Sequence, residues 1–242
     1  MVSGPSVVIL TGAGISAESG LSTFRGPDGL WAGERVESVA TPEGFAADPA
    51  RVQRFYNRLR GQLGEVHPNP AHEALARLEC HLGSRMLLVT QNIDDLHQRA
   101  GSTRLTAMHG ELKKIRHVET GEVLDWPYDV KESETVWRPH VVWFGERTIG
   151  LDVVMEKLTA ASVFAAVGTS GTVYPASRFA EIAKAAGAVT VEINLNATGS
   201  VGYDYAWVGP ASQLVPELVD QIITTGSITS GSRQTGHRLM AD

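Results

Sequence analysis

The sequence predicts an α/β protein built on a doubly wound parallel sheet, and two observations support this prediction. Short apolar runs rich in β-branched residues recur along the chain and alternate with stretches of helical spacing. A small polar turn follows several of these runs, and ligands of open parallel sheets bind beyond the carboxyl ends of the strands. Fold and ligand site are therefore predicted together.

Length and composition narrow the class of protein. The chain has 242 residues, of which 43% are hydrophobic and 20% charged, so it can form one large domain or one domain with a smaller insert. A net charge of −6 gives no general attraction for phosphate backbones, and we expect no nucleic-acid partner. No apolar run approaches the roughly 18 residues of a membrane span, so we expect no membrane partner and a cytoplasmic location. The single cysteine, Cys80, excludes an intrachain disulfide and favours burial as a small apolar side chain.

The most informative stretch follows the apolar run at residues 7–10. Gly12, Gly14 and Ala17 have the G-x-G-x-x-A spacing of a dinucleotide-binding turn. The first glycine permits a tight turn, the second lets the backbone approach a pyrophosphate, and the small third residue lets helix pack on strand. The N–H groups of the new helix would then face the phosphates. The same pattern also occurs in plain tight turns, so the other polar loops are needed to decide whether this turn binds a dinucleotide.

The remaining elements are expected in chain order. Thr41 and Pro42 have the residue types of a helix start, and a second helix is predicted from Asn69 as cap to Gly83 as stop. Further strands are expected at 85–90, 138–146, 163–168, 189–193 and 206–208, with helices after Pro175 and at 210–223. Residues 111–137 have the character of a small insert. Residues 226–242 are rich in glycine, serine and threonine, and we expect a disordered tail.

Four polar loops follow four of these strands and form the candidate site. Their members are Gly12, Ala13, Gly14, Ile15 and Ser16; Gln91, Asn92, Ile93 and Asp94; Gly168, Thr169 and Ser170; and Asn194 and Asn196. The turn-rich segment with Phe24 and Arg25 is expected to lie above the first loop as a lid. His109 is a further candidate, although a lone histidine is more often structural.

Five ordered motifs make the chain resemble the sirtuins, which are NAD-dependent protein lysine deacylases. The motifs are Gly12-Ala13-Gly14-Ile15-Ser16, Thr23-Phe24-Arg25-Gly26, Thr90-Gln91-Asn92-Ile93-Asp94, His109-Gly110 and Gly168-Thr169-Ser170, and the resemblance spans about residues 6–223. It implies a Rossmann-type NAD-binding domain from 1–30, 83–110 and 139–225. It also implies a smaller domain made from two inserts, at 31–82 and 111–138.

The resemblance also implies a reaction and a role for each residue. Acyl groups would leave protein lysine with release of nicotinamide and formation of O-acyl-ADP-ribose. The four loops, with Phe24 and Arg25, would bind NAD, and Asn92 and Asp94 would hold its carboxamide and ribose. Phe24 would shield the ribose C1′ carbon. The catalytic residues would be Asn92 and His109, the latter acting as general base through the ribose hydroxyls.

Acylated-lysine proteins are the implied partners. The resemblance places peptide capture on Val142, Trp143, Phe144, Gly145 and Glu146 together with Val173 and Tyr174, as segments to which an extended peptide adds as a strand. Trp143 and Phe144 fit a plain core role equally well. Ala40 and Tyr56 would line the acyl pocket.

The chain departs from the sirtuin pattern in the second insert. Most sirtuins bind zinc there through two Cys-x-x-Cys pairs, but residues 111–137 hold no cysteine and one histidine, His117. We therefore predict no zinc and an insert packed around Trp126, Tyr128 and Trp137.

A second departure concerns the acyl group. Related desuccinylases read an acidic acyl chain with a Tyr-x-x-Arg pair, whereas here Tyr56 is followed at that spacing by Leu59. Arg58 and Arg60 lie about 100° to either side on a regular helix and also fit an exposed surface. We expect a preference for neutral acyl groups, with desuccinylation or demalonylation as the alternative. Protein ADP-ribosylation and non-catalytic NAD sensing are further alternatives.

Overall fold

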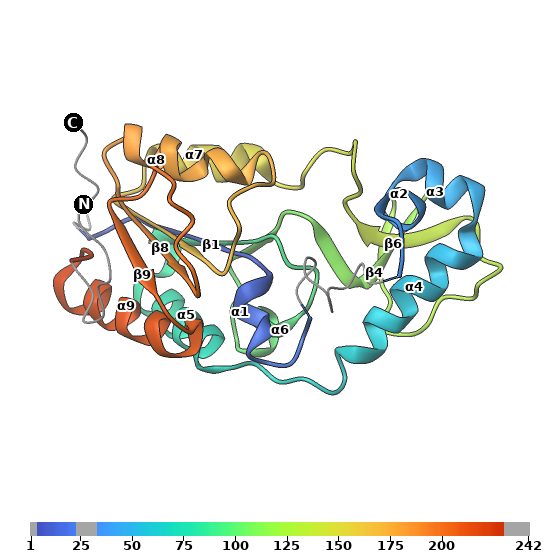
Figure 1. The fold of residues 1–242 in the computed structure, drawn as a ribbon, viewed down its shortest axis with the longest axis horizontal. Coiled ribbons are helices and arrows are strands. Elements are labelled where there is room, and N and C mark those ends of the chain that lie inside the picture. Colours follow the sequence, from blue (N-terminus) through green and yellow to red (C-terminus); the bar gives the residue numbers. More distant parts are fainter. Residues whose placement is uncertain (1–3, 23–32, 230–242) are drawn as a thin grey trace.

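A six-stranded parallel sheet forms the centre of the larger part of the molecule. The computed structural model describes residues 4–22 and 33–229 (Figure 1). The strands of the sheet are β1 (Val7–Thr11), β2 (Met86–Thr90), β3 (Leu105–Ala107), β7 (Val163–Val167), β8 (Val189–Asn194) and β9 (Tyr205–Val208). Their order is β3-β2-β1-β7-β8-β9, and all five neighbouring pairs are parallel.

Helices cover both faces of this sheet. One core packs α5 (Pro70–Leu82) and α9 (Ala211–Thr225) against one face, and the other packs α7 (Leu151–Thr159) and α8 (Phe179–Ala185) against the opposite face. Val7 and Ile9 point into the first core, Val8 and Leu10 into the second. Burial on both faces explains why the strands are apolar throughout, and it confirms the predicted doubly wound sheet.

The strand order places a crevice beside β1. The chain runs from β1 to β2 on one side and later adds β7 on the other, so the direction of winding reverses at β1. Loops at such a switch point separate beyond the carboxyl ends of the strands. Two short helices begin there, α1 (Ala13–Ala17) after β1 and α6 (Leu96–Arg99) after β2. Two 3₁₀ turns, η1 (Gly83–Arg85) and η2 (Ala176–Arg178), complete this part.

The smaller part has its own core. It contains α2 (Val36–Val39), α3 (Pro42–Ala47), α4 (Pro49–Gln62) and an antiparallel sheet of β4 (Gly110–His117), β5 (Val123–Asp125) and β6 (Trp137–Val141), in the order β5-β4-β6. Thr41 accepts a hydrogen bond from the Gly44 N–H and Asp48 one from the Arg51 N–H, so each oxygen caps a helix. The helix start predicted at Thr41 is confirmed, and the chain breaks again at Asp48 before α4.

The expected boundary at residue 82 is wrong for α5. Its Leu75 and Leu78 are fully buried in the core of the large sheet, and the helix packs on α9. The predicted cap Asn69 and stop Gly83 are confirmed. Cys80, expected to be buried, is exposed on this helix. Helical periodicity revealed an apolar face here without showing which core would cover it.

Of the three aromatic residues expected to pack the second insert, only the half-buried Trp137 contacts another ring from a different strand, that of His117. Tyr128 is 67% exposed and Trp126 37% exposed, because both lie outside the small-domain core. Hydrogen bonds from α4 hold the segment instead. Gln53 Nε2 donates to the carbonyl of Trp137 at 2.8 Å, and Asn57 pairs with both backbone groups of Val130, at 2.8 and 2.9 Å.

Three further findings concern the segments around these cores. The strand expected over 138–146 ends at Val141, and residues 142–146 form a turn. No helix within 4–22 and 33–229 is long and apolar enough to cross a membrane. The greater part of the expected tail, residues 230–242, lies outside the described residues.

Candidate active site

The turn after β1 is wedged against the loop after β7. Gly12 N–H donates to the carbonyl of Val167 at 2.9 Å, and Gly14 N–H donates to that of Gly168 at 2.8 Å. A Cβ on Gly14 would lie 2.6 Å from the Gly168 Cα, and Gly168 itself has a φ of +62°. The glycines are thus required by contact between two loops. The N–H groups of Gly12 and Gly14 are therefore used within the protein, and the expected contact of helix N–H groups with phosphates stays a prediction.

Two amide side chains join this pair of loops to their neighbours. Gln91 Nε2 donates to Thr169 Oγ1 at 2.8 Å, and Asn194 Nδ2 donates to the Thr169 carbonyl at 2.8 Å. The structure therefore brings together members of all four predicted loops. Ser170, whose hydroxyl pairs with Thr172, and Asn196 are exposed beside them.

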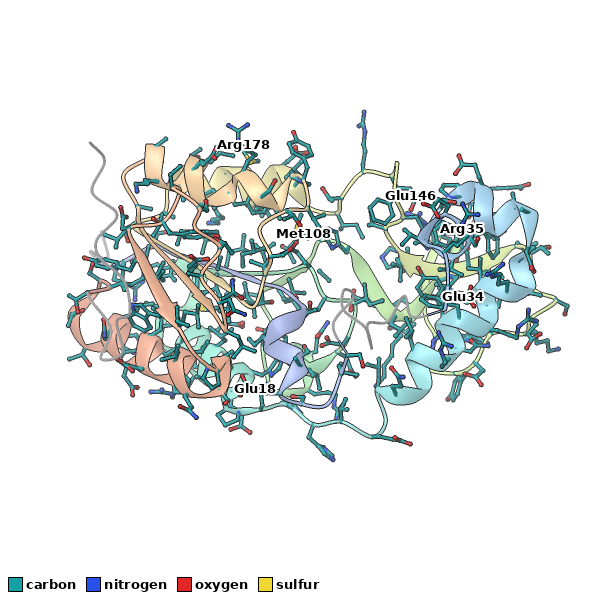
Figure 2. All side chains as sticks on the ribbon, in the orientation of Figure 1. Glu18, Glu34, Arg35, Met108, Glu146 and Arg178 are labelled. Carbon is teal, nitrogen blue, oxygen red and sulfur yellow. The ribbon has the colours of Figure 1, made fainter. Side chains whose placement is uncertain are left out.

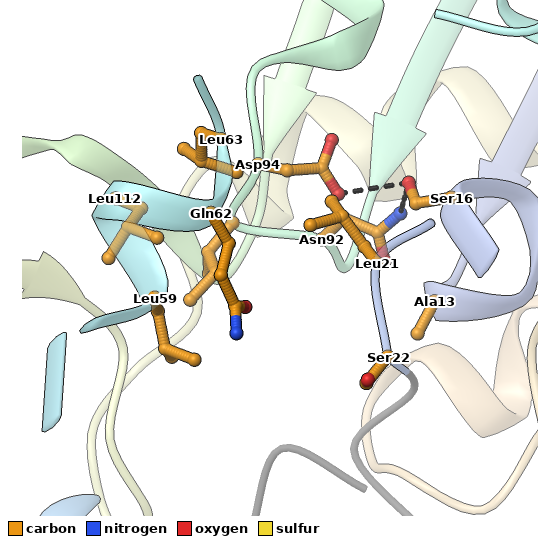
Figure 3. Close-up of a pocket in the computed structure, with 11 residues that line it drawn as sticks. Ala13, Ser16, Leu21, Ser22, Leu59, Gln62, Leu63, Asn92, Asp94 and Leu112 are labelled. Atoms are coloured by element: carbon orange, nitrogen blue, oxygen red, sulfur yellow. Dashed lines mark hydrogen bonds between the residues drawn. The ribbon is translucent and has the colours of Figure 1, made fainter. Parts of the chain in front are cut away.

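Asn92, Ser16 and Asp94 form a buried polar group in the crevice. Asn92 Nδ2 donates to the Gly12 carbonyl and to Ser16 Oγ, each at 3.1 Å, and Ser16 Oγ donates to Asp94 Oδ2 at 2.9 Å (Figure 3). The second Asp94 oxygen accepts from the Leu96 N–H. Burial raises the pKa of Asp94, although these hydrogen bonds oppose the shift.

One atom of this group, Asn92 Oδ1, takes no part in these hydrogen bonds. Asn92 Oδ1 is buried and has no hydrogen-bond partner among the residues that the structure describes. A buried amide oxygen without a donor is costly. The atom is therefore suited to accept a hydrogen bond from a ligand.

A pocket lies next to this group, between the two parts of the molecule (Figure 3). The large domain contributes Ala13, Ser16, Leu21, Ser22, Asn92, Ile93 and Asp94, and the small domain contributes Leu59, Gln62, Leu63 and Leu112. The small-domain side is apolar apart from Gln62. The other polar side chains of the pocket, Ser16, Ser22, Asn92 and Asp94, come from the large domain. Leu21, Ser22, Gln62, Leu63 and Leu112 were not among the predicted residues. The helical spacing from Leu59 would have found Gln62 and Leu63.

His109 is held in one tautomer. Its Nδ1 lies 2.9 Å from the carbonyl of Gln91, so Nδ1 carries the proton and Nε2 keeps its lone pair. Burial lowers the pKa of His109, and the hydrogen bond to Gln91 opposes this shift only in part. A neutral imidazole with a free lone pair can act as a general base.

The residues predicted for the acyl group lie deeper than expected. Ala40 and Tyr56 are 3% and 2% exposed, belong to the small-domain core, and are not among the residues that line the pocket. Tyr56 Oη accepts a hydrogen bond from Trp143 Nε1 at 2.9 Å, and the Arg138 guanidinium stacks 3.6 Å from the Trp143 ring centre. Burial raises the pKa of Tyr56. Trp143 is therefore a core residue.

The peptide segments are partly exposed. Phe144 and Tyr174 are 60% and 78% exposed, which suits contact with a partner. The Val142 N–H donates to the His109 carbonyl at 2.8 Å and the Phe144 N–H to the Ala40 carbonyl at 3.0 Å, so neither can pair with a peptide.

An ion pair between Arg138 and Glu146 closes the turn at residues 142–146. Glu146, which is labelled in Figure 2, accepts a hydrogen bond at Oε2 from the Trp143 N–H, and the same oxygen lies 2.8 Å from Arg138 Nη2. Gly145 has a φ of +90° in this turn, and Val173 is half-buried. Phe24 and Arg25 lie outside the described residues.

The fold and the crevice define the class as an α/β protein of dinucleotide-binding architecture with an inserted small domain. Residues 12–175 match the model of the Sir2 family. This match covers more than half of the chain, and the chain belongs to the Sir2 family.

Two bacterial proteins are similar in sequence to this chain along almost its whole length. The NAD-dependent protein deacylase of Escherichia coli (strain K12) is 54% identical over 231 residues, which cover 90% of this chain and 82% of that protein. The protein of the same description from Yersinia pestis is 50% identical, covering 91% and 84%.

Two solved structures are similar to this one in fold. The crystal structure of a Sir2 homologue in complex with NAD has a TM-score of 0.82 at 39% identity and covers 91% of this chain and 90% of its own. A Sir2 variant with a deacetylated peptide and 3′-O-acetyl ADP-ribose has a TM-score of 0.77 at 27% identity, covering 93% and 96%.

Proposed function

We propose that this chain is an NAD-dependent protein deacylase, which removes acetyl or related acyl groups from lysine and yields nicotinamide and O-acyl-ADP-ribose. The observation that carries the proposal is the unpartnered Asn92 Oδ1 in the pocket, on the edge of the sheet that also presents His109. Relatives described as NAD-dependent protein deacylases support the activity. The relative with a deacetylated peptide supports a protein substrate.

The donor set fits a nicotinamide group. Among the described residues, Asn92 Oδ1 is a buried acceptor without a donor, and a carboxamide N–H₂ would supply one. Leu63 and Leu112 offer an apolar wall for the ring. When bound, NAD supplies an electrophilic ribose carbon and a leaving nicotinamide. Asn92 and Asp94 would then orient the nucleotide.

His109 holds the role of base. Its Nδ1–H is fixed on the Gln91 carbonyl, which leaves Nε2 to accept a proton from a ribose hydroxyl. The lowered pKa keeps the ring neutral near pH 7. Gln91 also contacts Thr169, so one residue connects the base with the loop after β7.

The peptide is proposed to lie along 142–146 and Val173–Tyr174. Because the N–H groups of Val142 and Phe144 are occupied, pairing depends on carbonyl groups of this segment and on the exposed side chains of Phe144 and Tyr174. Such pairing reads little sequence.

The acyl group is proposed to be neutral. Leu59 faces the pocket, whereas Arg60 Nε donates to the Leu112 carbonyl at 3.0 Å and Arg58 stacks over the Phe55 ring. Neither arginine reaches the pocket from the regular α4 helix. A carboxylate would lose its hydration there without a cation to compensate.

A structural zinc ion does not fit the described residues. They contain no group of three His, Cys, Asp or Glu side chains able to hold a metal ion, and Cys80 lies on α5 outside the second insert. Elemental analysis is expected to find no stoichiometric zinc, and chelators are expected to leave the melting temperature unchanged. One equivalent of tightly bound zinc would contradict this.

The function is tested by incubating the protein with NAD and acetyl-lysine peptides and following the products by mass spectrometry. We expect nicotinamide, deacetylated peptide and O-acetyl-ADP-ribose in equal amounts. Protein that has gained ADP-ribose while its acetyl-lysine stays intact would instead show ADP-ribosylation. Binding of NAD without any product would leave the chain as an NAD-sensing module.

A further inference from the structure

Two buried histidines lie directly behind the Asn92 loop and take no part in the proposed reaction. His72 of α5 and His97 of α6 are 0% and 1% exposed, and their ring centres are 4.8 Å apart. Both remain neutral, since burial lowers the pKa of His72 to about 4 and that of His97 to about 3. Buried polar rings within an apolar core require a reason.

The hydrogen bonds determine the tautomer of each ring. His72 Nδ1 accepts from the Asn69 N–H at 3.3 Å, so its proton is on Nε2. His97 Nε2 lies 2.9 Å from Thr11 Oγ1, and the Thr11 hydroxyl donates its own proton to Thr90 Oγ1. His97 Nε2 must therefore be the donor, which leaves a lone pair on Nδ1.

The remaining ring nitrogens of the two histidines are of complementary hydrogen-bonding type. His72 Nε2 and His97 Nδ1 are both buried and without a hydrogen-bond partner within 4–22 and 33–229. One is an N–H donor and the other a lone-pair acceptor, on rings that contact each other. The two atoms are complementary in type, although no hydrogen bond joins them in the structure, and the contact between the rings restricts how His97 can turn.

The chain of bonds ends in the active site. Thr90 Oγ1 accepts from the Asn92 N–H at 3.1 Å, and Thr11 immediately precedes Gly12, whose carbonyl accepts from the Asn92 side chain. At the other end, Asn69 Nδ2 donates to the Ile15 carbonyl of α1. The histidine pair thus connects the three segments that surround the buried Asn92 group.

We propose that His97, packed against His72, is a positioning residue that fixes the hydroxyls of Thr11 and Thr90, through them the backbone N–H of Asn92, and so the place of the Asn92 side chain. His97 donates to Thr11, so the Thr11 proton points to Thr90, and Thr90 Oγ1 is held where it accepts from Asn92. Loss of the donor frees the Thr11 hydroxyl to rotate. This inference rests on the proposed function for its kinetic consequence, but not for its structural one.

The test compares His97→Leu with His97→Gln. Leucine removes the donor, whereas the glutamine amide can donate to Thr11 and accept from His72. For His97→Leu we expect kcat/KM for NAD to fall by about tenfold, mainly through KM, with recovery of most of the loss in His97→Gln. Leu158→Ala is the control, because this fully buried residue lies on the opposite face of the sheet. It is expected to lower the melting temperature with kcat/KM changed by less than about twofold.

Nitrogen-15 NMR of the unliganded protein gives a readout that is independent of activity. We expect neutral imidazoles with the proton on Nε2 in both histidines, and a shift of the Asn92 side-chain N–H₂ signal in His97→Leu that is absent in Leu158→Ala. A proton on Nδ1 of His97, or an unmoved Asn92 signal, would overturn the proposal. Equal kcat/KM for His97→Leu and wild type would also overturn it. An inactive wild-type protein would refute the proposed function, while the NMR result would still decide the network.

Discussion

His109 shows how one hydrogen bond selects a chemical role. Its contact with the Gln91 carbonyl places the proton on Nδ1, and burial keeps the ring neutral. The sequence placed this histidine at the site only through its resemblance to a family. The structure adds the tautomer, and the tautomer carries a testable kinetic consequence.

We predict that His109→Ala lowers kcat by about 10²- to 10⁴-fold, the usual contribution of a general base. NAD affinity, measured by calorimetry, is expected to change little because the ring acts on a hydroxyl. Since the pKa of His109 is lowered, kcat/KM of the wild type should stay high at pH 6.5 and fall only as the pH drops through the lowered value. Near-native turnover of the variant would remove His109 from the mechanism.

A second prediction at the scale of residues concerns Leu59, which we propose sets the acyl preference. Leu59→Arg introduces a cation into the pocket, and we expect the ratio of kcat/KM for succinyl over acetyl peptide to rise by at least about tenfold. Arg58→Met and Arg60→Met serve as controls, because both arginines point elsewhere in the structure. A tenfold preference of the wild type for succinyl, lost in either Met variant, would contradict the assignment.

At the scale of elements, α4 joins the two inserts. Its apolar face packs in the small-domain core, its last turn lines the pocket, and its polar side holds the second insert. Asn57 is central to this side, because it pairs with both backbone groups of Val130 and accepts from Arg60 Nη1 at 2.6 Å. One helix therefore couples the stability of the insert to the wall of the pocket.

Asn57→Ala is expected to lower the free energy of unfolding by about 1–3 kcal/mol, since it leaves buried backbone groups of Val130 without partners. Chemical denaturation measures this change. Arg54→Ala on the same helix is the matched control. The side chains of Arg54 and Glu132, which form an ion pair, are 55% and 52% exposed, so the loss of this pair should change the free energy of unfolding far less. Equal effects of the two substitutions would contradict the role given to Asn57.

For the molecule as a whole, the two buried histidines make stability depend on pH. Their pKa values of about 4 and 3 in the folded protein lie below the ordinary value near 6.5. The unfolded chain therefore binds more protons as the pH falls from about 6.5, and the folded state loses stability down to about pH 3. The slope is up to about 1.4 kcal/mol per pH unit for each histidine.

Denaturation curves between pH 7 and pH 4 test this prediction. We expect His97→Gln to flatten the decline relative to the wild type, whereas His81→Gln, an exposed histidine on α5, should leave it unchanged. An identical slope in the wild type and His97→Gln would exclude the buried pair as its source.

Much of this architecture could be predicted from local patterns. Apolar runs predicted five of the six strands of the large sheet but missed the short β3. Asn69, Gly83, Thr41 and Pro42 marked helix ends correctly because caps are local signals. The four polar loops do converge on one edge.

Features that depend on contacts between distant segments could not be predicted. The apolar face of α5 did not reveal which core it joins, and the opening glycines did not reveal that a second loop, around Gly168, lies against them. The aromatic residues Trp126 and Tyr128 suggested a core, but the hydrogen bonds of α4 hold the insert. No spacing in the sequence relates Asn57 to Val130.

The central position of β1 has a consequence for synthesis on the ribosome. This strand precedes both of its neighbours in the chain, since Val7 pairs with Met86 on one side and Val163 on the other. At about 5–20 residues per second, the wait for β7 is on the order of ten seconds. During that time at least one edge of an apolar strand is exposed to other nascent chains. Overproduction at low temperature or with chaperones should therefore raise the yield of native protein, and slowing translation alone should not.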